Sequence, residues 1–495
     1  MVSRGAFQEL DAVSLLTPHT KLAIRPPSLE SIPDIVTAAY RNSWYGRPGT
    51  GFVDLPADVI QGKVEDAEEI HSTAVVPLPP RGGVDLEKLA QVVSILKTAK
   101  APLIVVGKGA AYAQAEAAIR QLVDRAQIPF LPTPMGKGVL PDSHPLNTAS
   151  ARSTALKEAD VVLILGARLN WILHFGDAPK WNPHATFIQI DISADELARS
   201  SRTSTFGLVG DLATVVPQLI HFIGSWRYNP SCSSYTSHLT ASARKNEINA
   251  MQKSTVSKNP MSYARVFHII KETLHSLSPA SKGGIVYVSE GANTMDISRS
   301  IFPVEYPRLR LDAGTHATMG VGLGYAIAAH AAYNSNTAEA TSGPAKRKKI
   351  VALEGDSAFG FSAMEVETMA RYDMDILIFV INNGGVYHGD SDNADEWLAL
   401  QKATASHETA GGKGGLRSTS LGWEVGYEKI AEMCGGLGFL VRTEEQLEKA
   451  TREGYKAGRV TVVNVIVEAG KGAKLEFGWQ ASGKKEKGKR ATAKL

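Results

Sequence analysis

The sequence predicts an α/β protein in which parallel sheets are flanked by helices. Short apolar runs that are typical of buried strands alternate with helical patterns in two long regions, from about Leu86 to Ile223 and from Met261 to about Ala469. Strands that alternate with helices in this way form parallel sheets, because each helix returns the chain to the edge where the next strand begins. The composition agrees, since 495 residues with 43% apolar and 21% charged side chains suffice for two or three globular domains.

Two linkers divide the chain. A proline- and glycine-rich stretch at residues 76–83 follows residues 1–65, and a polar, serine-rich stretch that carries some helix occupies residues 225–260. We therefore expect, after a small N-terminal region, a central Rossmann-like domain at 84–224, a C-terminal domain at 261–470 and a basic tail at 480–495. Strands are expected at Leu103–Val106, Val161–Leu165, Phe187–Ile190, Gly207–Val209, Ile285–Val288, Leu309–Leu311, Ile350–Leu353, Ile376–Ile381, Phe439–Val441 and Val460–Val467.

One strand–helix–strand unit carries polar residues at both strand ends. The run Lys349–Leu353 leads to Gly355-Asp356-Ser357, a helical pattern follows through Ala363–Ala370, and the run Ile376–Ile381 leads to Asn382-Asn383, which places Asn383 27 residues after Asp356. Both ends of such a crossover reach the same edge of a sheet, where α/β proteins bind ligands. The aspartate and asparagine offer two hard oxygen ligands for a magnesium ion on a diphosphate, and the glycines let backbone N–H groups approach phosphate. The alternative is a generic unit in which Gly-Asp is only a turn.

Composition excludes several classes of protein. No run of about 18 apolar residues occurs, so no membrane-spanning helix is expected. The net charge of +3 is too small to indicate a nucleic-acid partner. Cys232 and Cys434 are the only cysteines and lie far apart in the sequence, which argues against a disulfide framework or a cysteine-bound metal and fits a reducing compartment.

The C-terminal tail resembles an organelle address. The last residues, Ala493-Lys494-Leu495, differ from the Ser-Lys-Leu peroxisomal signal at one position, and basic residues precede them from Lys484 onward. This ending predicts a peroxisomal location, with a peroxisomal import receptor as a partner. A solvated charged tail that ends in leucine by chance is the alternative.

The motif at residues 355–357 and 382–383 resembles that of the thiamine-diphosphate enzymes, in which Gly-Asp-Gly is followed after a spacer by Asn-Asn; Ser357 stands at the third position, as in some branches of the family. Longer stretches are similar to the 2-hydroxyacyl-CoA lyases and the related oxalyl-CoA decarboxylases, from Gly5 to about Trp479. These stretches are Gly107–Tyr112, Leu131–Gly138, Gly166–Trp171, Ser289–Asp296, Asp312–Thr315, Thr318–Gly324 and Gly355–Thr368.

The resemblance implies the thiamine-diphosphate-enzyme fold and a cofactor site in the C-terminal, diphosphate-binding domain. Asp356, the side chain of Asn383 and the carbonyl of Gly385 would hold Mg²⁺. Met319 would support the bent cofactor from below, although core packing is a compatible alternative. The residues expected near the diphosphate are Asn293, Gly355, Ser357 and Ala358. A homo-oligomer, either a dimer or a tetramer with each cofactor shared between subunits, is also implied.

The resemblance also bears on substrate and on a second ligand. Phe7-Gln8 looks like the 2-hydroxyacyl-CoA lyases, which implies cleavage of a 2-hydroxyacyl-CoA to formyl-CoA and an aldehyde one carbon shorter, as in fatty acid α-oxidation. Gln8 and Tyr387 are therefore the candidate catalytic residues, and Tyr387 could equally serve only to pack its loop. Oxalyl-CoA decarboxylation is the rival activity. In the central domain Lys108, Arg168 and Asp191 stand where the oxalyl-CoA decarboxylases bind ADP, and a purely structural role is the alternative there.

The N-terminal region looks incomplete. Residues 41–58 resemble the end of the pyrimidine-binding domain, but residues 1–65 are shorter than the ~100–150 residues expected of such a domain. The region is therefore expected to be a remnant without the glutamate that activates the cofactor in the family, and a subunit that binds cofactor without turnover is a further alternative. Ala317 replaces a glycine common in relatives, which predicts a negative φ at that position. His316 before it is expected to lie at the surface.

Overall fold

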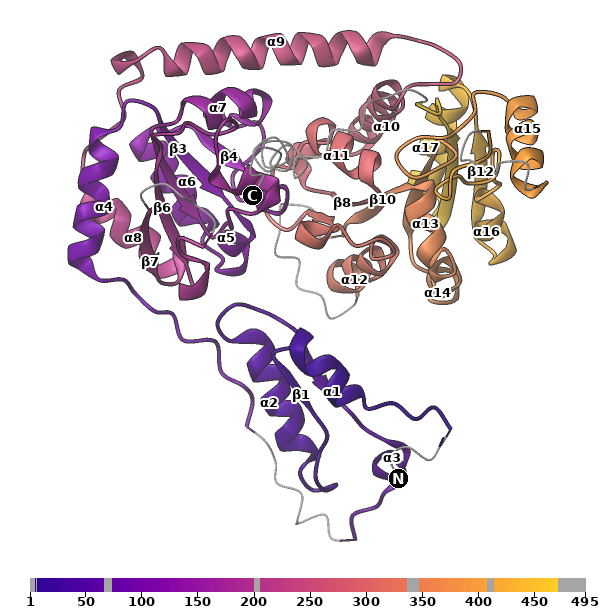
Figure 1. The fold of residues 1–495 in the computed structure, drawn as a ribbon, viewed down its shortest axis with the longest axis horizontal. Helices are drawn as coiled ribbons and strands as arrows, with labels where there is room; N and C mark the ends of the chain where they lie inside the picture. Colours follow the sequence, from indigo (N-terminus) through magenta and orange to yellow (C-terminus); the bar gives the residue numbers. More distant parts are fainter. Residues whose placement is uncertain are drawn as a thin grey trace, which may run out of the picture.

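A computed structural model of the chain describes residues 5, 7–65, 74–199, 205–335, 347–406 and 414–470. The predicted basic tail and its Ala493-Lys494-Leu495 ending lie outside the described residues. Within the described ranges, no helix combines the length and apolar character that crossing a bilayer requires. The fold is α/β, as predicted, with every strand pairing parallel in its sheet (Figure 1).

The central domain is built on a five-stranded sheet. Across the sheet the order is β4 (Phe130–Pro132), β3 (Pro102–Val106), β5 (Val161–Leu165), β6 (Thr186–Asp191) and β7 (Thr205–Val209). Every residue of β3 and β5 is buried, which explains why these strands appear in the sequence as continuous apolar runs rather than alternating ones.

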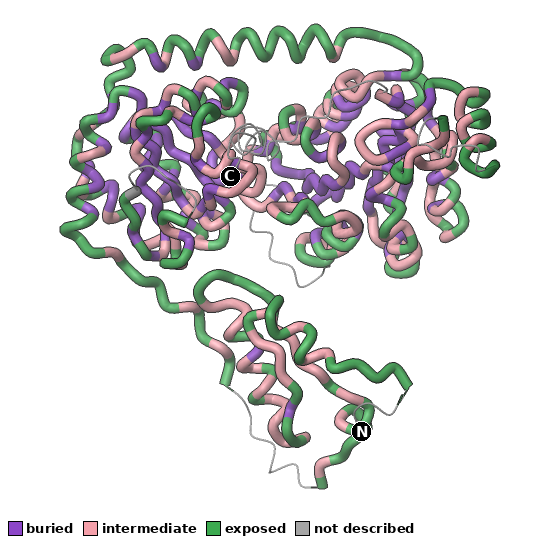
Figure 2. The backbone as a smooth tube through the Cα atoms, in the orientation of Figure 1, coloured by how far each residue is buried: buried purple, intermediate pink, exposed green. Residues whose placement is uncertain are grey.

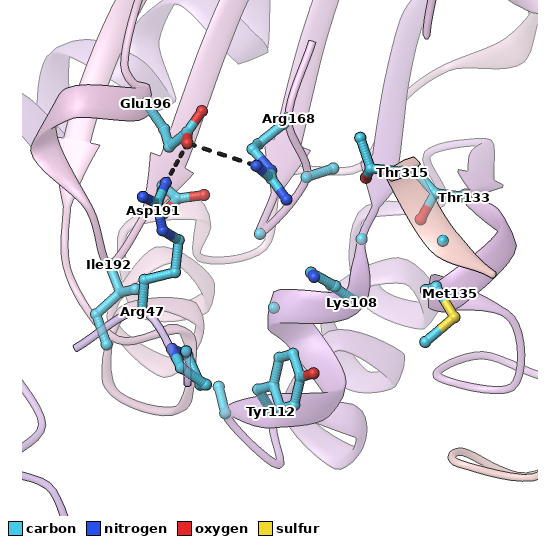
Figure 3. A pocket seen from close by; sticks show the side chains of 18 of the residues that line it. Arg47, Lys108, Tyr112, Thr133, Met135, Arg168, Asp191, Ile192, Glu196 and Thr315 are labelled. Atoms are coloured by element: carbon cyan, nitrogen blue, oxygen red, sulfur yellow. Dashed lines mark hydrogen bonds and ion pairs between the residues drawn. The ribbon is translucent and has the colours of Figure 1, made fainter. Parts of the chain in front are cut away.

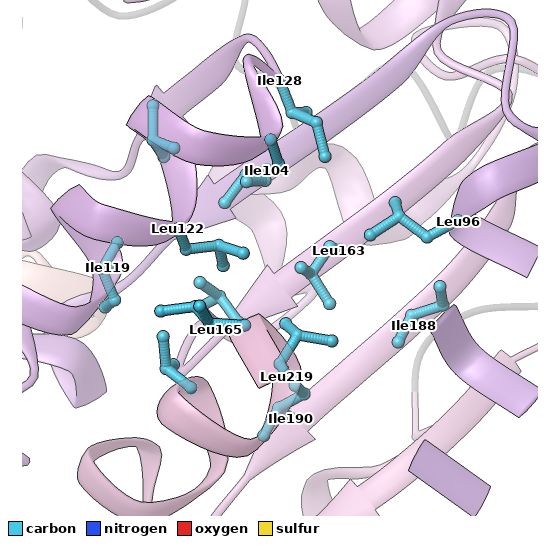
Figure 4. Packing of buried hydrophobic residues seen from close by; sticks show 14 of the residues in the cluster. Leu96, Ile104, Ile119, Leu122, Ile128, Leu163, Leu165, Ile188, Ile190 and Leu219 are labelled. Carbon is cyan, nitrogen blue, oxygen red and sulfur yellow. The ribbon is translucent and has the colours of Figure 1, made fainter. Parts of the chain in front are cut away.

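Helices cover both faces of this sheet. One face packs against α4 (Leu86–Thr98), α6 (Glu116–Ala126) and α8 (Leu212–Ile223), and Figure 4 shows Leu122 and Leu219 against Leu163 and Leu165. The other face packs against α7 (Arg152–Glu158) and the start of α9 (Tyr235–Thr255). A short helix, α5 (Lys108–Tyr112), begins directly after β3.

The C-terminal domain is built on a six-stranded sheet. Its order is β12 (Leu437–Val441), β13 (Thr461–Ile466), β11 (Ile376–Asn382), β10 (Lys349–Gly355), β8 (Ile285–Glu290) and β9 (Arg310–Asp312). One face packs against α10 (Tyr263–Leu277), α11 (Ala292–Ile301) and α17 (Glu444–Lys456). The other packs against α12 (Gly322–Asn334), α13 (Asp356–Ser362), α14 (Glu365–Arg371) and α16 (Glu428–Met433). An exposed helix, α15 (Ala394–Ala405), follows β11.

The polar stretch between the two domains is more regular than its sequence indicates. Most of it is the 21-residue helix α9, which runs alongside both domains in Figure 1. Only Tyr235 and Leu239 of this helix are buried, so it lacks the apolar stripe by which a helix is recognised in a sequence. The two domains also touch directly: Trp171 Nε1 donates to the carbonyl of Thr315 at 2.7 Å, and the backbone N–H of Val304 donates to Asp142 at 2.8 Å.

The N-terminal unit has little core of its own. It contains α1 (Ala12–Leu16), β1 (Leu22–Ile24), α2 (Ile32–Trp44), β2 (Gly51–Val53) and α3 (Ala57–Gln61), with β1 and β2 forming a two-stranded parallel sheet. Within the described part of residues 5–65 only Pro26 and Ala39 are buried, and Figure 2 shows the unit coloured almost entirely as intermediate and exposed. Arg47 links it to the central domain through an ion pair with Glu196.

Candidate active site

The predicted metal ligands meet at the carboxyl edge of the C-terminal sheet. Strands β10 and β11 are adjacent and parallel, with Gly355 paired to Ile381, so the residues that follow them emerge side by side. Asn382 turns away from this edge, since its Nδ2 donates to the carbonyl of Val425 at 3.2 Å. Asn383 is thereby left to face Asp356, because successive side chains of a strand point to opposite sides.

Asp356 is 2% exposed and held by backbone N–H groups. One carboxylate oxygen accepts from Ser357 N at 2.7 Å, and the other accepts from Gly384 N at 2.8 Å and Gly385 N at 3.2 Å. Burial raises the pKa of Asp356 to about 6, against the opposing effect of these hydrogen bonds. A nearby cation would favour the ionised form of such a buried carboxyl group and lower its pKa.

Asn383 and Asp356 both accept a hydrogen bond from the backbone N–H of Gly385. The Oδ1 of Asn383 accepts from Gly385 N at 3.3 Å, the same N–H that contacts Asp356, and its Nδ2 donates to the carbonyl of Tyr387 at 3.0 Å. Two hard oxygens therefore converge beside Gly385, a donor set suited to Mg²⁺. No group of three or more His, Cys, Asp or Glu side chains forms a metal cluster in the described ranges. An ion here would depend on this carboxylate, this amide and backbone oxygen.

Glycines allow the surrounding turns to approach each other. Gly291, between β8 and α11, has φ +86°, and a Cβ on it would lie 2.9 Å from the backbone nitrogen of Gly355. The next turn places Asn293 at the site, where its Nδ2 donates to the carbonyl of Tyr387. Ser357 and Ala358 occupy the first turn of α13. The cradle that these residues form fits a diphosphate held against backbone N–H groups.

Tyr387 and Met319 both lie in turns that contain backbone of positive φ. Tyr387 is half-buried, has φ +66°, and has its phenol pKa raised by burial and by Asp296. Met319 is half-buried and precedes Gly320, which has φ +90°. The prediction of a negative φ at Ala317 is wrong: this residue has φ +49°, because it ends a short helical turn in the left-handed conformation. His316 is exposed, as expected.

A pair of buried glutamates lies beneath the turn that carries Met319 and Gly320, and it was not predicted from the sequence. Glu290 is the last residue of β8 and is paired in register with Glu354, the next-to-last residue of β10, and both side chains are at most 1% exposed. Glu290 accepts hydrogen bonds from Gly320 N and Gly322 N, whereas the Glu354 oxygens have no hydrogen-bond partner among the described residues. Burial, followed by the charge of Glu290, raises the pKa of Glu354 well above its usual value of 4.5, which favours the neutral form of this carboxyl. The signal in the sequence was a Glu-Gly pair after each of two apolar runs.

The residues proposed to bind a nucleotide line a separate cavity of about 970 Å³. Lys108, Arg168 and Asp191 lie at the carboxyl ends of the central strands, and Figure 3 shows Arg168 and Arg47 both directed toward Glu196. Desolvation, then the charges of Arg168 and Arg47, lowers the pKa of Lys108, and burial raises that of Asp191. The sequence had indicated neither Arg47 nor Glu196, because they come from loops distant in the chain.

Ile172 and Leu173 line this cavity, and they belong to the segment Trp171–Gly176. His174 and Phe175 are left-handed at φ 50° and 57°, and His174 Nε2 lies 3.3 Å from Arg152 Nη1. Burial, then the charges of Arg152 and Lys180, lowers the pKa of His174 from 6.5 to about 4.

This shift predicts a pH dependence of stability. The folded-state pKa of His174 lies below the unfolded value, so the unfolded chain takes up the proton first and stability falls as pH falls from 6.5 to 4. His174→Gln should lose part of this dependence in thermal unfolding scans across that range. The exposed His184→Gln is the control, and parallel curves for His174→Gln and the wild type would contradict the prediction.

Gln8 is not brought to the candidate site within this chain. It is exposed, has φ +55° and belongs to the N-terminal unit, whereas the cluster around Asp356 belongs to the C-terminal domain.

Comparison with known proteins identifies the family. Residues 89–219 match the central domain of thiamine pyrophosphate enzymes, and residues 290–465 match their C-terminal TPP-binding domain. The 2-hydroxyacyl-CoA lyase 1 of Homo sapiens is 40% identical over 468 residues, which cover 94% of this chain and 76% of that protein. The chain belongs to the thiamine pyrophosphate enzymes. Among these enzymes it is grouped with the 2-hydroxyacyl-CoA lyases, as predicted, and it is a thiamine-diphosphate-dependent lyase.

The chain is also similar to two further proteins and to one solved structure. The 2-hydroxyacyl-CoA lyase of Arabidopsis thaliana is 39% identical over 481 residues (95% of this chain, 78% of that protein), and the oxalyl-CoA decarboxylase of Escherichia coli K12 is 34% identical over 472 residues (95% and 77%). The crystal structure of benzoylformate decarboxylase from Polynucleobacter necessarius superposes with a TM-score of 0.68 at 17% identity, covering 94% of this chain and 78% of that one. This last similarity confirms the thiamine-diphosphate-enzyme fold.

Proposed function

We propose that the protein cleaves a 2-hydroxyacyl-CoA into formyl-CoA and an aldehyde one carbon shorter, with thiamine diphosphate and Mg²⁺. The reaction breaks the bond between C1 and C2 of the acyl group; the hydroxyl carbon leaves as the aldehyde and the thioester carbon as formyl-CoA. The observation that carries the proposal is the convergence of Asp356 and Asn383 on Gly385 N, in a chain 40% identical to a 2-hydroxyacyl-CoA lyase.

The residues of this chain would hold and orient the cofactor. Bound thiamine diphosphate supplies a nucleophilic carbon and an electron sink for breaking a carbon–carbon bond. Asp356, Asn383 and the carbonyl of Gly385 would hold the Mg²⁺ that neutralises the diphosphate. Around them, Gly355, Ser357, Ala358 and Asn293 form the cradle for its oxygens.

Three further residues would face the reacting end of the cofactor. Met319, half-buried at the turn above Glu290, would support the cofactor in its bent shape. Tyr387 would direct its hydroxyl toward the substrate, and Gln8 would direct its side-chain amide toward it from the N-terminal unit. Because Gln8 lies in a different unit from Asp356, its part in the site requires an assembly in which subunits complete each other's sites, and we propose such a homo-oligomer. Sedimentation of the purified protein tests the assembly.

The substrate assignment is tested with the purified full chain, thiamine diphosphate and Mg²⁺. A long-chain 2-hydroxyacyl-CoA should yield formyl-CoA and the shortened aldehyde in equal amounts, measured by liquid chromatography, and oxalyl-CoA should yield no CO₂. Release of CO₂ and formyl-CoA from oxalyl-CoA, without lyase activity, would instead establish the decarboxylase alternative, whose basis is the 34% identity to the Escherichia coli enzyme. Cofactor binding without turnover of either substrate would indicate an impaired subunit.

The cavity of the central domain is proposed to bind ADP as an effector. Lys108, Arg168 and Arg47 bring three cationic groups to it, while Asp191 is an acceptor at its edge, a set that suits phosphate oxygens and a ribose hydroxyl. Titration calorimetry measures whether the wild type binds ADP and whether Arg168→Ala binds it more weakly.

The proposed location is the peroxisome, where an import receptor would read Ala493-Lys494-Leu495 and where 2-hydroxyacyl-CoA cleavage would belong to fatty acid α-oxidation. The basis is the resemblance of this terminus to the Ser-Lys-Leu signal. Microscopy of a fluorescent fusion with and without the last three residues tests this location.

A further inference from the structure

The loop that carries the metal ligands is paired with a later segment of the chain. The backbone N–H of Val386 donates to the carbonyl of Thr419 at 3.0 Å, and that of Leu421 donates to the carbonyl of Gly384 at 3.0 Å. Gly385 has no room for a side chain, because a Cβ would lie 3.0 Å from the carbonyl oxygen of Thr419. The position of Gly385 therefore depends on where residues 417–421 lie.

Four groups fix that segment to the loop, and we call them the Arg417 clamp: Arg417, Asp390, Ser420 and the carbonyl of His388. Arg417 donates to Asp390 from its backbone nitrogen at 2.9 Å and from Nε, and it donates to the His388 carbonyl from Nη2 at 2.6 Å. Ser420 Oγ donates to the same Asp390 carboxylate. A single guanidinium thus binds a carboxylate and a carbonyl of the loop at once.

The clamp differs from an ordinary surface ion pair. The side chain of Asp390 is 11% exposed and that of Arg417 36%, whereas the side chains of Arg442 and Glu424 in the same domain are 48% and 24% exposed. Among the described residues, the Arg442 side chain donates to Glu424 and to no loop carbonyl. Exposed pairs contribute little to stability, but a partly buried arginine that satisfies several acceptors fixes geometry.

The loop needs such a restraint. Tyr387 is left-handed, a conformation that a tyrosine adopts only when its surroundings enforce it. Its carbonyl accepts from Asn293 and Asn383, and the next carbonyl, that of His388, accepts from Arg417. Two consecutive carbonyls are thereby held in place, one by the residues of the site itself and one by the clamp.

We propose that Arg417 is a positioning residue for the metal site: through Asp390 and the His388 carbonyl it holds Gly385 and Asn383 where their oxygens can bind the cation. This inference rests on the proposed function, because it presupposes that Mg²⁺ and a diphosphate occupy the site. The hydrogen bonds of Arg417 go to Asp390 and His388 rather than to the proposed ligands Asp356, Asn383 and Gly385. Arg417 acts on the loop that carries Asn383 and Gly385.

Arg417→Gln tests the proposal through metal-dependent cofactor binding. Thiamine diphosphate binding is followed by titration calorimetry at a series of Mg²⁺ concentrations. We expect the Mg²⁺ concentration for half-maximal binding to rise about 10-fold, the lower end of the effect of removing a partner that orients a metal ligand. Saturating Mg²⁺ should restore binding, which a general loss of folding would not permit. Arg442→Gln, which removes the more exposed Arg442–Glu424 pair of the same domain, should leave the Mg²⁺ requirement unchanged.

Two milder variants keep the test decisive if Arg417→Gln folds poorly. Ser420→Ala removes one hydrogen bond of the clamp and should raise the Mg²⁺ requirement in the same direction by a smaller factor. Arg417→Lys keeps the charge but not the planar fork, so it should fall between the wild type and Arg417→Gln. A Mg²⁺ requirement equal to that of the wild type in all three variants would overturn the inference. Failure of the wild type itself to bind the cofactor with Mg²⁺ would instead overturn the proposed function.

Discussion

Asp356→Asn is expected to abolish metal-dependent binding of thiamine diphosphate. The substitution keeps the shape of the side chain but removes the only carboxylate among the proposed ligands. It also turns an N–H group toward the Gly384 and Gly385 donors that the carboxylate now accepts. We expect affinity in the presence of Mg²⁺ to fall by more than about 100-fold, beyond the 10- to 100-fold that follows loss of an outer-shell partner. Titration calorimetry with and without a chelator measures the effect.

The control for this variant is Glu367→Gln, which removes a carboxylate from the exposed Glu367–Arg371 pair of α14. It should bind the cofactor as the wild type does. Binding by Asp356→Asn with an unchanged Mg²⁺ requirement would show that the cation is held elsewhere, and the assignment of the site would then be wrong.

Glu290→Ala is expected to destabilise the C-terminal domain strongly. Its carboxylate accepts the N–H groups of Gly320 and Gly322, and truncation leaves the half-buried donor of Gly320 and the buried donor of Gly322 without this acceptor. Two such losses of about 1–3 kcal/mol each should lower the apparent unfolding temperature on the order of 10 °C. The turn that carries Met319 would lose its anchor, so cofactor affinity should fall as well.

Glu354→Gln is the matched comparison for Glu290→Ala. Because burial raises the pKa of Glu354 and favours its neutral form, a neutral amide of the same size should change stability by less than about 1 kcal/mol. Calorimetric unfolding of the two variants decides the matter. If Glu354→Gln proves as damaging as Glu290→Ala, Glu354 is ionised in the folded protein and a bound cation must compensate it.

The sheet and its ligand edge could be predicted because they rest on local patterns. Continuous apolar runs indicate buried parallel strands, and the 27-residue spacing from Asp356 to Asn383 follows from one strand–helix–strand crossover. The structure accordingly brings both side chains to one N–H group, that of Gly385.

What could not be predicted depends on contacts between distant segments. Glu196 becomes notable only when folding gathers Arg47, Arg168 and Arg199 around it. Helix α9 was underestimated because its exposed faces leave no periodic signal. The backbone of Ala317 was wrongly predicted because no local feature of an alanine reveals a left-handed turn.

The left-handed backbone of Tyr387 restricts how this site can be altered by protein engineering. In a saturation library at that position, the backbone conformation will decide which variants fold well. Glycine and asparagine adopt this region of φ and ψ easily, and β-branched residues do not. Residues that adopt the left-handed conformation easily lack the aromatic ring, and residues that resemble tyrosine carry the same backbone strain. New specificities are therefore better sought at neighbouring positions whose backbone is ordinary.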